Sequence, residues 1–193
     1  MKIAVDMDEV LATFCDQFIE FHNYKYKTKY NKNDFFSFDF SKILNCSEKE
    51  ALDRVEDFFK SESFKEIGLI PGAIEGIKKL KEKHELHLVT GRQEEIRDET
   101  INWINKYFPN TFKTINFSNH YSKLYKKTTK AEICIKLGVK ALIEDSLEYS
   151  KELEEHHIKV ILMNVPWNQK ENLPSNFVRV YNWDEIIKEI NKI

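Results

Sequence analysis

Short apolar runs, each followed by a polar or acidic residue, recur along the chain and predict buried β-strands. They cover residues 3–5, 86–89, 141–143, 160–163 and 177–181. Segments with helical spacing of apolar residues lie between and after them, at 73–83, 94–107, 131–137, 147–156 and 183–193. This alternation predicts an α/β fold, a Rossmann-like three-layer arrangement in which helices cover both faces of a parallel sheet. In such sheets ligands bind at the carboxyl ends of the strands.

One interval breaks this rhythm and predicts an insertion after the first strand. Asp6 and Thr90 end the first two predicted strands but are 84 positions apart, whereas a simple strand-helix-strand unit needs about 30 residues. Residues 14–64 hold ten of the 14 Phe and three of the 8 Tyr. We therefore expect a small helical cap at 14–70, with a Pro-Gly turn at its end, and an α/β core at 1–13 and 71–193.

Composition excludes several classes of protein. The chain has 193 residues and a net charge of −2, which argues against a surface built for nucleic acid or anionic lipid. Its three cysteines are widely spaced with no Cys-x-x-Cys pair, so a disulfide framework or zinc cluster is not indicated. No apolar run approaches the roughly 18 residues of a membrane span. We expect a protein of the cytoplasm.

Two acidic residues follow the first predicted strand. Asp6 and Asp8 lie two positions apart, and the period of a strand points both side chains into the crevice at its end. Two neighbouring carboxylates need a cation, and Mg²⁺ prefers oxygen ligands of this kind. The alternative is turn or helix-cap chemistry before a helix starting near Leu11.

Polar residues also follow the later strands. Thr90 and Gly91 end the second strand before a helix, where a hydroxyl and free amides suit a phosphate, although Thr-Gly is also an ordinary turn. Lys130 opens a helix, where an ammonium is misplaced for the helix dipole, so it is either an anion partner or a solvated lysine. Glu144 and Asp145 follow the apolar strand 141–143 and form a second acidic pair.

Together these four sites resemble the motifs of the haloacid dehalogenase (HAD) superfamily of phosphohydrolases: an Asp-x-Asp after the first strand, a Thr or Ser after the second, a Lys, and an acidic pair. The resemblance spans the whole chain and implies a HAD-like fold. Within the superfamily, residues 6–14 and 70–75 look most like the 5′(3′)-deoxyribonucleotidases. Two positions depart from the usual pattern, namely Gly91-Arg92 after the motif-two Thr and Glu144 in place of an aspartate.

The resemblance implies a role for each motif residue. Asp6 would be the nucleophile that forms an aspartyl-phosphate, and Asp8 the general acid and then the base. Thr90 and Lys130, with the Gly91 amide, would hold the phosphoryl oxygens. Mg²⁺ would be bound by Asp6, the main-chain carbonyl of Asp8, and Asp145. Glu144 would steer a water ligand of the ion.

The expected activity is therefore that of a Mg²⁺-dependent phosphomonoesterase, a hydrolase acting on a nucleoside monophosphate. Phe14 stands where these nucleotidases stack an aromatic ring on the base, but Phe14, Phe18 and Phe21 also have the spacing of a helix's inner face. The alternatives are a phosphatase for a sugar phosphate or another small metabolite, and a non-catalytic ligand-binding or phosphoacceptor domain. We read Trp167 as a packed loop residue.

Overall fold

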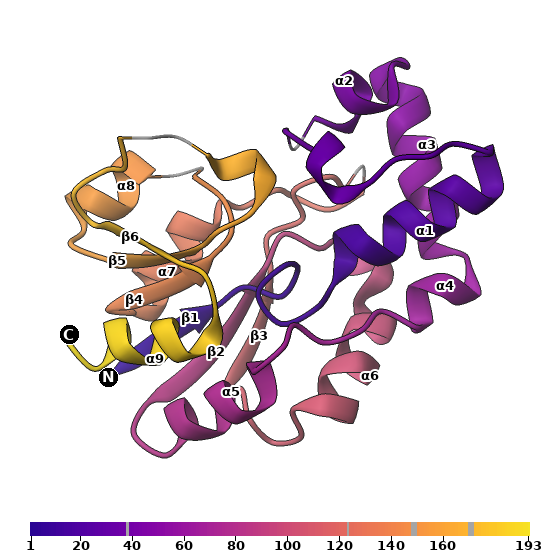
Figure 1. Cartoon of the computed structure of the whole chain (residues 1–193). Coiled ribbons are helices and arrows are strands. Elements are labelled where there is room, and N and C mark those ends of the chain that lie inside the picture. Colours follow the sequence, from indigo (N-terminus) through magenta and orange to yellow (C-terminus); the bar gives the residue numbers. More distant parts are fainter. Residues whose placement is uncertain (38, 123, 148–149, 170–171) are drawn as a thin grey trace.

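The computed structural model describes residues 1–37, 39–122, 124–147, 150–169 and 172–193. Its centre is a six-stranded sheet in the order β3-β2-β1-β4-β5-β6, in which every neighbouring pair is parallel. The strands are β1 (Lys2–Val5), β2 (Glu85–Thr90), β3 (Thr114–Phe117), β4 (Ala141–Glu144), β5 (Lys159–Met163) and β6 (Phe177–Val180). The predicted α/β fold with a parallel sheet is confirmed (Figure 1).

Helices cover both faces of the sheet and form a lobe beside it (Figure 1). The helices are α1 (Phe14–Tyr26), η1 (Lys32–Asp34), α2 (Phe40–Leu44), α3 (Glu48–Phe59), α4 (Glu62–Lys65), α5 (Ala73–Lys81), η2 (Glu94–Ile96), α6 (Arg97–Tyr107), α7 (Lys130–Leu137), α8 (Ser150–Glu155), η3 (Pro166–Asn168) and α9 (Trp183–Ile190). Buried residues of α5, α6 and α9 share one apolar cluster with the sheet, and those of α7 and α8 share a second.

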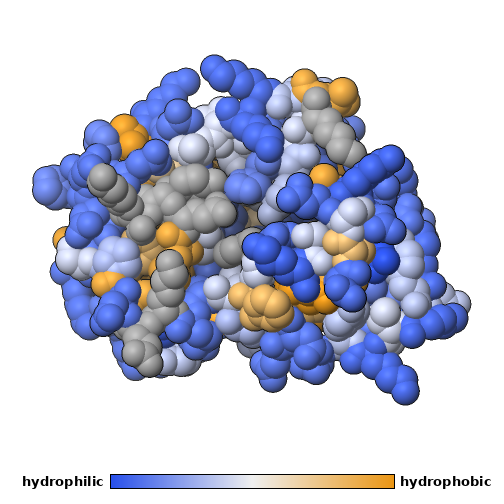
Figure 2. Space-filling view, turned by 90° about the horizontal axis from the view of Figure 1, so that it is seen from above, coloured by the Kyte–Doolittle hydropathy of each residue, from blue (hydrophilic) through white to orange (hydrophobic). Residues whose placement is uncertain are grey.

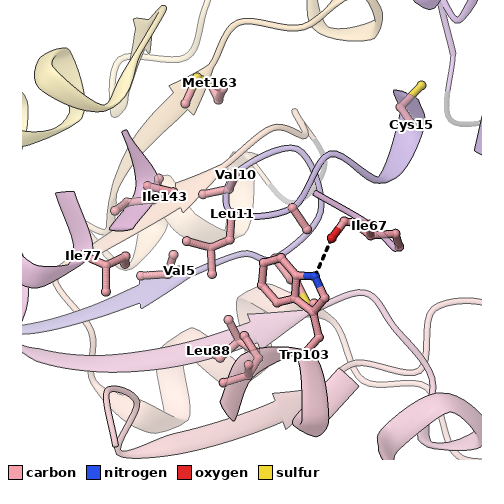
Figure 3. Close-up of a cluster of buried hydrophobic side chains, with 14 of the residues drawn as sticks. Val5, Val10, Leu11, Cys15, Ile67, Ile77, Leu88, Trp103, Ile143 and Met163 are labelled. Carbon is pink, nitrogen blue, oxygen red and sulfur yellow. Dashed lines mark hydrogen bonds between the residues drawn. The ribbon is translucent and has the colours of Figure 1, made fainter. Parts of the chain in front are cut away.

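Alternation along β1 explains the two clusters. Ile3 and Val5 point to the α5, α6 and α9 side, while Ala4 points to the α7 and α8 side, because successive strand residues face opposite sides of a sheet. All three are fully buried, as expected for a central strand of a parallel sheet. In the first cluster the indole Nε1 of Trp103 donates to the carbonyl oxygen of Ile67 at 2.8 Å, which ties α6 to the chain that returns from the lobe (Figure 3).

The lobe consists of α1 to α4, which lie in sequence between β1 and α5, and Figure 1 shows it beyond the carboxyl end of β1. An aromatic cluster holds it together, with Phe18, Phe35 and Phe58 fully buried. The rings of Phe18 and Phe58 meet edge to face at 5.6 Å, and those of Phe18 and Phe35 at 6.2 Å, the geometry that aromatic quadrupoles favour. The concentration of Phe seen in the sequence therefore forms the aromatic core of the lobe, which is continuous with the apolar cluster on the α5, α6 and α9 side of the sheet.

Three elements differ from the sequence-based predictions. Strand β3 was not predicted, because its four residues do not form an apolar run and three of them are half exposed at the edge of the sheet. No helix starts near Leu11: residues 7–12 form a loop closed by hydrogen bonds from Leu11 N and Ala12 N to Met7 O, and α1 begins at Phe14. Helix α8 is shorter than the predicted 147–156, of which residues 148–149 lie outside the described part.

The surface seen from above is mainly hydrophilic, with hydrophobic residues in small separate patches (Figure 2). Within the described residues, none of the helices has both the length and the apolar character that crossing a bilayer requires.

Candidate active site

The carboxyl ends of the central strands bring the predicted polar residues together. Asp6 follows β1, Thr90 ends β2, and Glu144 and Asp145 lie at the end of β4. Oxygen atoms of Asp6, Glu144 and Asp145 all lie within 4.8 Å of one another, although Asp6 and Asp145 are far apart in the sequence. These carboxylates line one cavity of about 510 Å³ together with Asp8, Gly91 and Lys130.

Lys130 lies at the centre of this group. Its Nζ is 2.8 Å from Asp6 Oδ2 and 2.8 Å from Glu144 Oε2, and its side chain is only 11% exposed. Burial alone would lower the pKa of Lys130, but the Asp6 and Glu144 carboxylates outweigh it and raise that pKa. The lysine therefore remains a buried cation, which excludes the interpretation of Lys130 as a solvated surface residue.

The carboxylates outnumber this cation. Burial raises the pKa of Asp6 well above its usual range, and the charge of Glu144 adds to the rise. Burial and Glu144 raise the pKa of Asp145 in the same way. Burial would also raise the pKa of Glu144, but the nearby Lys130 ammonium lowers it. Further positive charge at this point would let Asp6 and Asp145 ionise together.

A metal ion fits these residues. Asp6 Oδ1 is buried and has no hydrogen-bond partner among the described residues, so an oxygen lone pair faces the acidic group unused. Three carboxylates with all ligand atoms within 4.8 Å form a set that hard divalent cations prefer. Asp145 is oriented from outside the set, since Trp167 Nε1 donates to its Oδ2 at 2.9 Å and Asn168 Nδ2 donates to its carbonyl oxygen at 2.8 Å.

Glu144 lines the cavity, and both of its oxygens are hydrogen-bonded within the protein. Both of its oxygens accept from Lys130 Nζ, at 2.8 and 3.1 Å, and Oε1 also accepts from the backbone N–H groups of Asp145 and Ser146. In this arrangement Glu144 holds Lys130 against Asp6 and fixes the turn that carries Asp145.

Thr90 and Gly91 follow one another at the end of β2, and Gly91 lies close to the Lys130 side chain. Thr90 is fully buried, and its Oγ1 accepts a hydrogen bond from the backbone N–H of Arg92 at 3.2 Å. A Cβ built on Gly91 would lie 3.8 Å from Lys130 Cε. The glycine backbone and the ammonium thus line the same cavity, whereas the fully buried Thr90 is not among the residues that line it, and the phosphate site at Thr90, Gly91 and Lys130 stays a prediction.

Asp8 is separate from the three clustered carboxylates. Its side chain is 27% exposed and turns to Arg92, whose Nε and Nη2 donate to its two oxygens at 3.0 and 2.8 Å. The sequence drew attention to Arg92 only as a departure from a family pattern. Arg92 pairs with a residue 84 positions away, and no local pattern in the sequence predicts such a pair.

Phe14 has two environments. Its ring packs edge to face on Phe58 at 5.4 Å and is stacked on Phe18 at 6.3 Å, so it belongs to the aromatic cluster of the lobe. It is also half buried and lines the cavity that contains Asp6 and Lys130. Phe18 is fully buried. Both interpretations of the Phe14 position are therefore compatible with its surroundings.

Glu9 is a further residue that the sequence did not single out. It adopts a positive φ of 59° and is buried, and its Oε1 accepts from the backbone N–H of Cys15 at 2.7 Å, at the start of α1. Its other oxygen pairs with Lys32 of the lobe, which also binds Asp16 at 2.9 Å. The carboxylate next to Asp8 thus anchors the lobe to the loop that follows β1.

The three tryptophans share one function in the structure. Trp167 donates to Asp145, Trp103 donates to Ile67 O, and Trp183 Nε1 donates to Val10 O at 3.0 Å. Each indole thus fixes the position of another segment of the chain, and Trp167 itself lines the cavity. Trp167 is therefore more than the packed loop residue expected from the sequence.

Comparisons with known proteins agree with this geometry. Residues 1–192 match the family model described as 5′ nucleotidase, deoxy (Pyrimidine), cytosolic type C protein. A 5′(3′)-deoxyribonucleotidase from Bacillus subtilis is 28% identical over 190 residues, which cover 97% of each chain.

Solved structures share the fold. A haloacid dehalogenase-like family hydrolase from Streptococcus pneumoniae has a TM-score of 0.70 at 14% identity, over 98% of this chain and 97% of that one. YfnB of Bacillus subtilis, named as a HAD-hydrolase and solved bound to magnesium, has a TM-score of 0.66 at 15% identity, over 98% of each chain. The fold is thus that of HAD hydrolases.

The site and the comparisons lead to the same conclusion. The protein is a hydrolase of phosphoric monoesters with a HAD-type fold, and its substrate is a small phosphate ester. The match of residues 1–192 covers nearly the whole chain, and so the chain belongs to the 5′ nucleotidase, deoxy (Pyrimidine), cytosolic type C family.

Proposed function

We propose that the protein is a Mg²⁺-dependent phosphomonoesterase that hydrolyses nucleoside monophosphates through an aspartyl-phosphate on Asp6. The observation that carries this proposal is the buried Asp6 carboxylate, which has one oxygen on Lys130 and the other without a hydrogen-bond partner among the described residues. A carboxylate held in this way beside a second carboxylate in the same cavity suits nucleophilic attack on phosphorus.

Each step of the proposed reaction is assigned to particular residues of the chain. Asp6 attacks the phosphorus, and the bond to the leaving oxygen breaks as Asp8 gives that oxygen a proton. Asp8 then takes a proton from water, which attacks the aspartyl-phosphate, releases inorganic phosphate and restores Asp6. Lys130, the Thr90 hydroxyl and the amide of Gly91 hold the phosphoryl oxygens, since phosphoryl transfer depends mainly on positioning and charge neutralisation.

Asp6, the main-chain carbonyl of Asp8, and Asp145 are the ligands proposed for the Mg²⁺ ion. When bound, the ion supplies positive charge beside the phosphoryl oxygens and the surplus carboxylates. The acidic group with its unused Asp6 oxygen supports this assignment, as does the oxygen preference of Mg²⁺.

A nucleotide suits the rest of the cavity. Its lobe side carries an aromatic wall of Phe14, Phe40 and Phe59 beside the polar residues Ser37, Asp39, Ser41 and Glu48, while the clustered carboxylates and Lys130 lie on the core side. Base stacking on an aromatic ring is favourable by about 1–3 kcal/mol, and the related Bacillus subtilis protein is named a 5′(3′)-deoxyribonucleotidase. A sugar phosphate would use the same phosphate site but would leave the aromatic wall without a partner. In this proposal residues 14–70 form a cap that carries the base side of the site.

The compartment proposed for this reaction is the cytoplasm. The three cysteines are all free, and two of them are buried. Unpaired thiols of this kind suit a reducing environment.

A phosphate-release screen tests the proposed function directly. Nucleoside 5′- and 3′-monophosphates, sugar phosphates and p-nitrophenyl phosphate are incubated with the protein and MgCl₂, with and without excess EDTA. We expect nucleotides to have the highest kcat/KM and EDTA to abolish release. Full activity in EDTA would contradict the metal role, and a preference for sugar phosphates would contradict the substrate class.

The variant Phe14→Leu tests the aromatic contact with the base. We expect KM for nucleotides to rise about 5- to 20-fold, because one stacking contact is lost, while KM for p-nitrophenyl phosphate stays nearly the same. Phe21→Leu is the matched control, because Phe21 packs on the same Phe58 ring at 5.3 Å but is not among the residues that line the cavity. Equal changes in KM for both substrates would assign Phe14 to the lobe core alone.

A further inference from the structure

Arg92 is a buried cation that contacts a carboxylate of the site. Its side chain is 4% exposed, and it forms a forked pair with Asp8 through Nε and Nη2 at 3.0 and 2.8 Å. Two parallel hydrogen bonds of this kind fix the plane of a carboxylate as well as its position. Asp6 and Asp8 are therefore held by different cations, Lys130 for Asp6 and Arg92 for Asp8.

The guanidinium of Arg92 also makes contacts with residues other than Asp8. Nη1 donates to Thr100 Oγ1 of α6 at 3.2 Å, and the Thr100 hydroxyl in turn donates to Ile96 O at 2.8 Å. The guanidinium carbon also lies 5.1 Å from the ring centre of Phe64, a buried residue of the lobe. Arginine favours such aromatic faces. Arg92 is thus held by the core and the lobe at once.

This fork leaves part of the Asp8 carboxylate accessible from the cavity. A carboxylate offers about four lone-pair sites, and the forked pair uses one on each oxygen. The remaining sites stay available on the side of the cavity, which Asp8 lines together with Asp6. The carboxylate is therefore oriented without being blocked, which is what a group that must meet a leaving oxygen at a defined angle requires.

We propose that Arg92 is a positioning residue that orients the Asp8 carboxylate toward the leaving oxygen, and that the contact between Arg92 and Phe64 couples this orientation to the lobe. The inference rests on the role of Asp8 in the proposed function. It predicts a specific kind of defect: loss of Arg92 lowers kcat/KM, which reports the step that releases the leaving group, only where the leaving oxygen needs a proton, whereas the later transfer of a proton from water to Asp8 is common to all substrates and affects kcat. A purely structural role would slow all substrates alike.

The experiment compares two leaving groups. p-Nitrophenolate leaves without a proton, whereas the sugar oxygen of dUMP needs one. We expect Arg92→Met to lower kcat/KM for dUMP by about 100-fold and for p-nitrophenyl phosphate by less than about threefold, in line with the size of general acid effects. Arg92→Lys, which keeps the charge but not the fork, should fall between wild type and Arg92→Met, and it supplies the comparison if the methionine variant does not fold.

A control and a double variant complete the design. Arg97→Met removes an arginine of α6 that pairs with Glu94 and packs over Phe117, outside the site, and should leave both rates within about twofold of wild type. In the Asp8→Asn background, adding Arg92→Met should change neither rate more than about threefold, because two residues that act through one step are not additive.

The outcomes distinguish a failure of the positioning role of Arg92 from a failure of the general acid role of Asp8. Equal losses for both substrates in Arg92→Met, or a further large loss in the double variant, would overturn the role of Arg92. If Asp8→Asn lowers kcat/KM equally for both substrates, the general acid assignment fails. If Asp8→Asn is selective for dUMP and Arg92→Met is not, only the inference on Arg92 fails.

Discussion

Replacement of Asp6 by asparagine is expected to lower phosphate release by at least about 10⁴-fold, because removal of a covalent nucleophile leaves only binding and electrostatic stabilisation. The amide has nearly the shape of the carboxyl group but cannot form the acyl-phosphate. The measurement is kcat for the best nucleotide and for p-nitrophenyl phosphate, and both should fall, since both reactions share the attack step.

The fold should survive this change. Asp6 is buried and burial raises its pKa, so a neutral side chain of the same size suits the site, and thermal unfolding should show a cooperative transition. Asp98→Asn is the matched control, an exposed aspartate in the first turn of α6, and should retain wild-type activity. Turnover of Asp6→Asn above about one tenth of wild type would refute the nucleophile assignment, because a loss of less than about tenfold is far smaller than the loss expected when a nucleophile is removed.

Replacement of Lys130 by methionine should have the second-largest effect. The change leaves the buried Asp6 and Glu144 carboxylates without the ammonium that now lies 2.8 Å from each. Removing one partner of a buried pair typically costs about 3–5 kcal/mol of unfolding free energy. Loss of the cation that is proposed to hold the phosphoryl oxygens should also reduce kcat by about 10²- to 10³-fold.

Denaturant unfolding at neutral pH, with EDTA and with MgCl₂, measures this effect. We expect MgCl₂ to recover part of the stability of Lys130→Met, since the ion adds positive charge to the same carboxylates, but not its activity. Lys127→Met, which removes an exposed lysine three positions away, should be indistinguishable from wild type. An unchanged unfolding midpoint in Lys130→Met would show that the buried ion pairs do not stabilise the fold.

The sequence contained enough information to predict the sheet and the residues at its edge. Buried central strands such as 141–143 are continuous apolar runs, and the polar residues that follow them stand out by contrast. Parallel strands bring such residues to one edge whatever their separation in sequence. This is why Asp6, Thr90, Lys130 and Asp145 could be grouped before any geometry was known.

The residues that orient this group could not be predicted in the same way. Arg92 and Trp167 each act on an aspartate through one side-chain contact, and neither leaves a periodic or local pattern. Strand β3 was missed because an edge strand needs no apolar run. Phe14 stayed ambiguous because helical spacing shows which face of α1 is buried, but not that the cavity opens beside that face.

The placement of the three indoles has a practical consequence. Trp167 lines the cavity and donates to Asp145, whereas Trp103 and Trp183 are buried and donate to Ile67 O and Val10 O. With excitation selective for tryptophan, the part of the emission that comes from Trp167 therefore originates at the site and responds to changes in local polarity there. Occupancy of the cavity can be titrated optically on the native protein, without a label and without turnover.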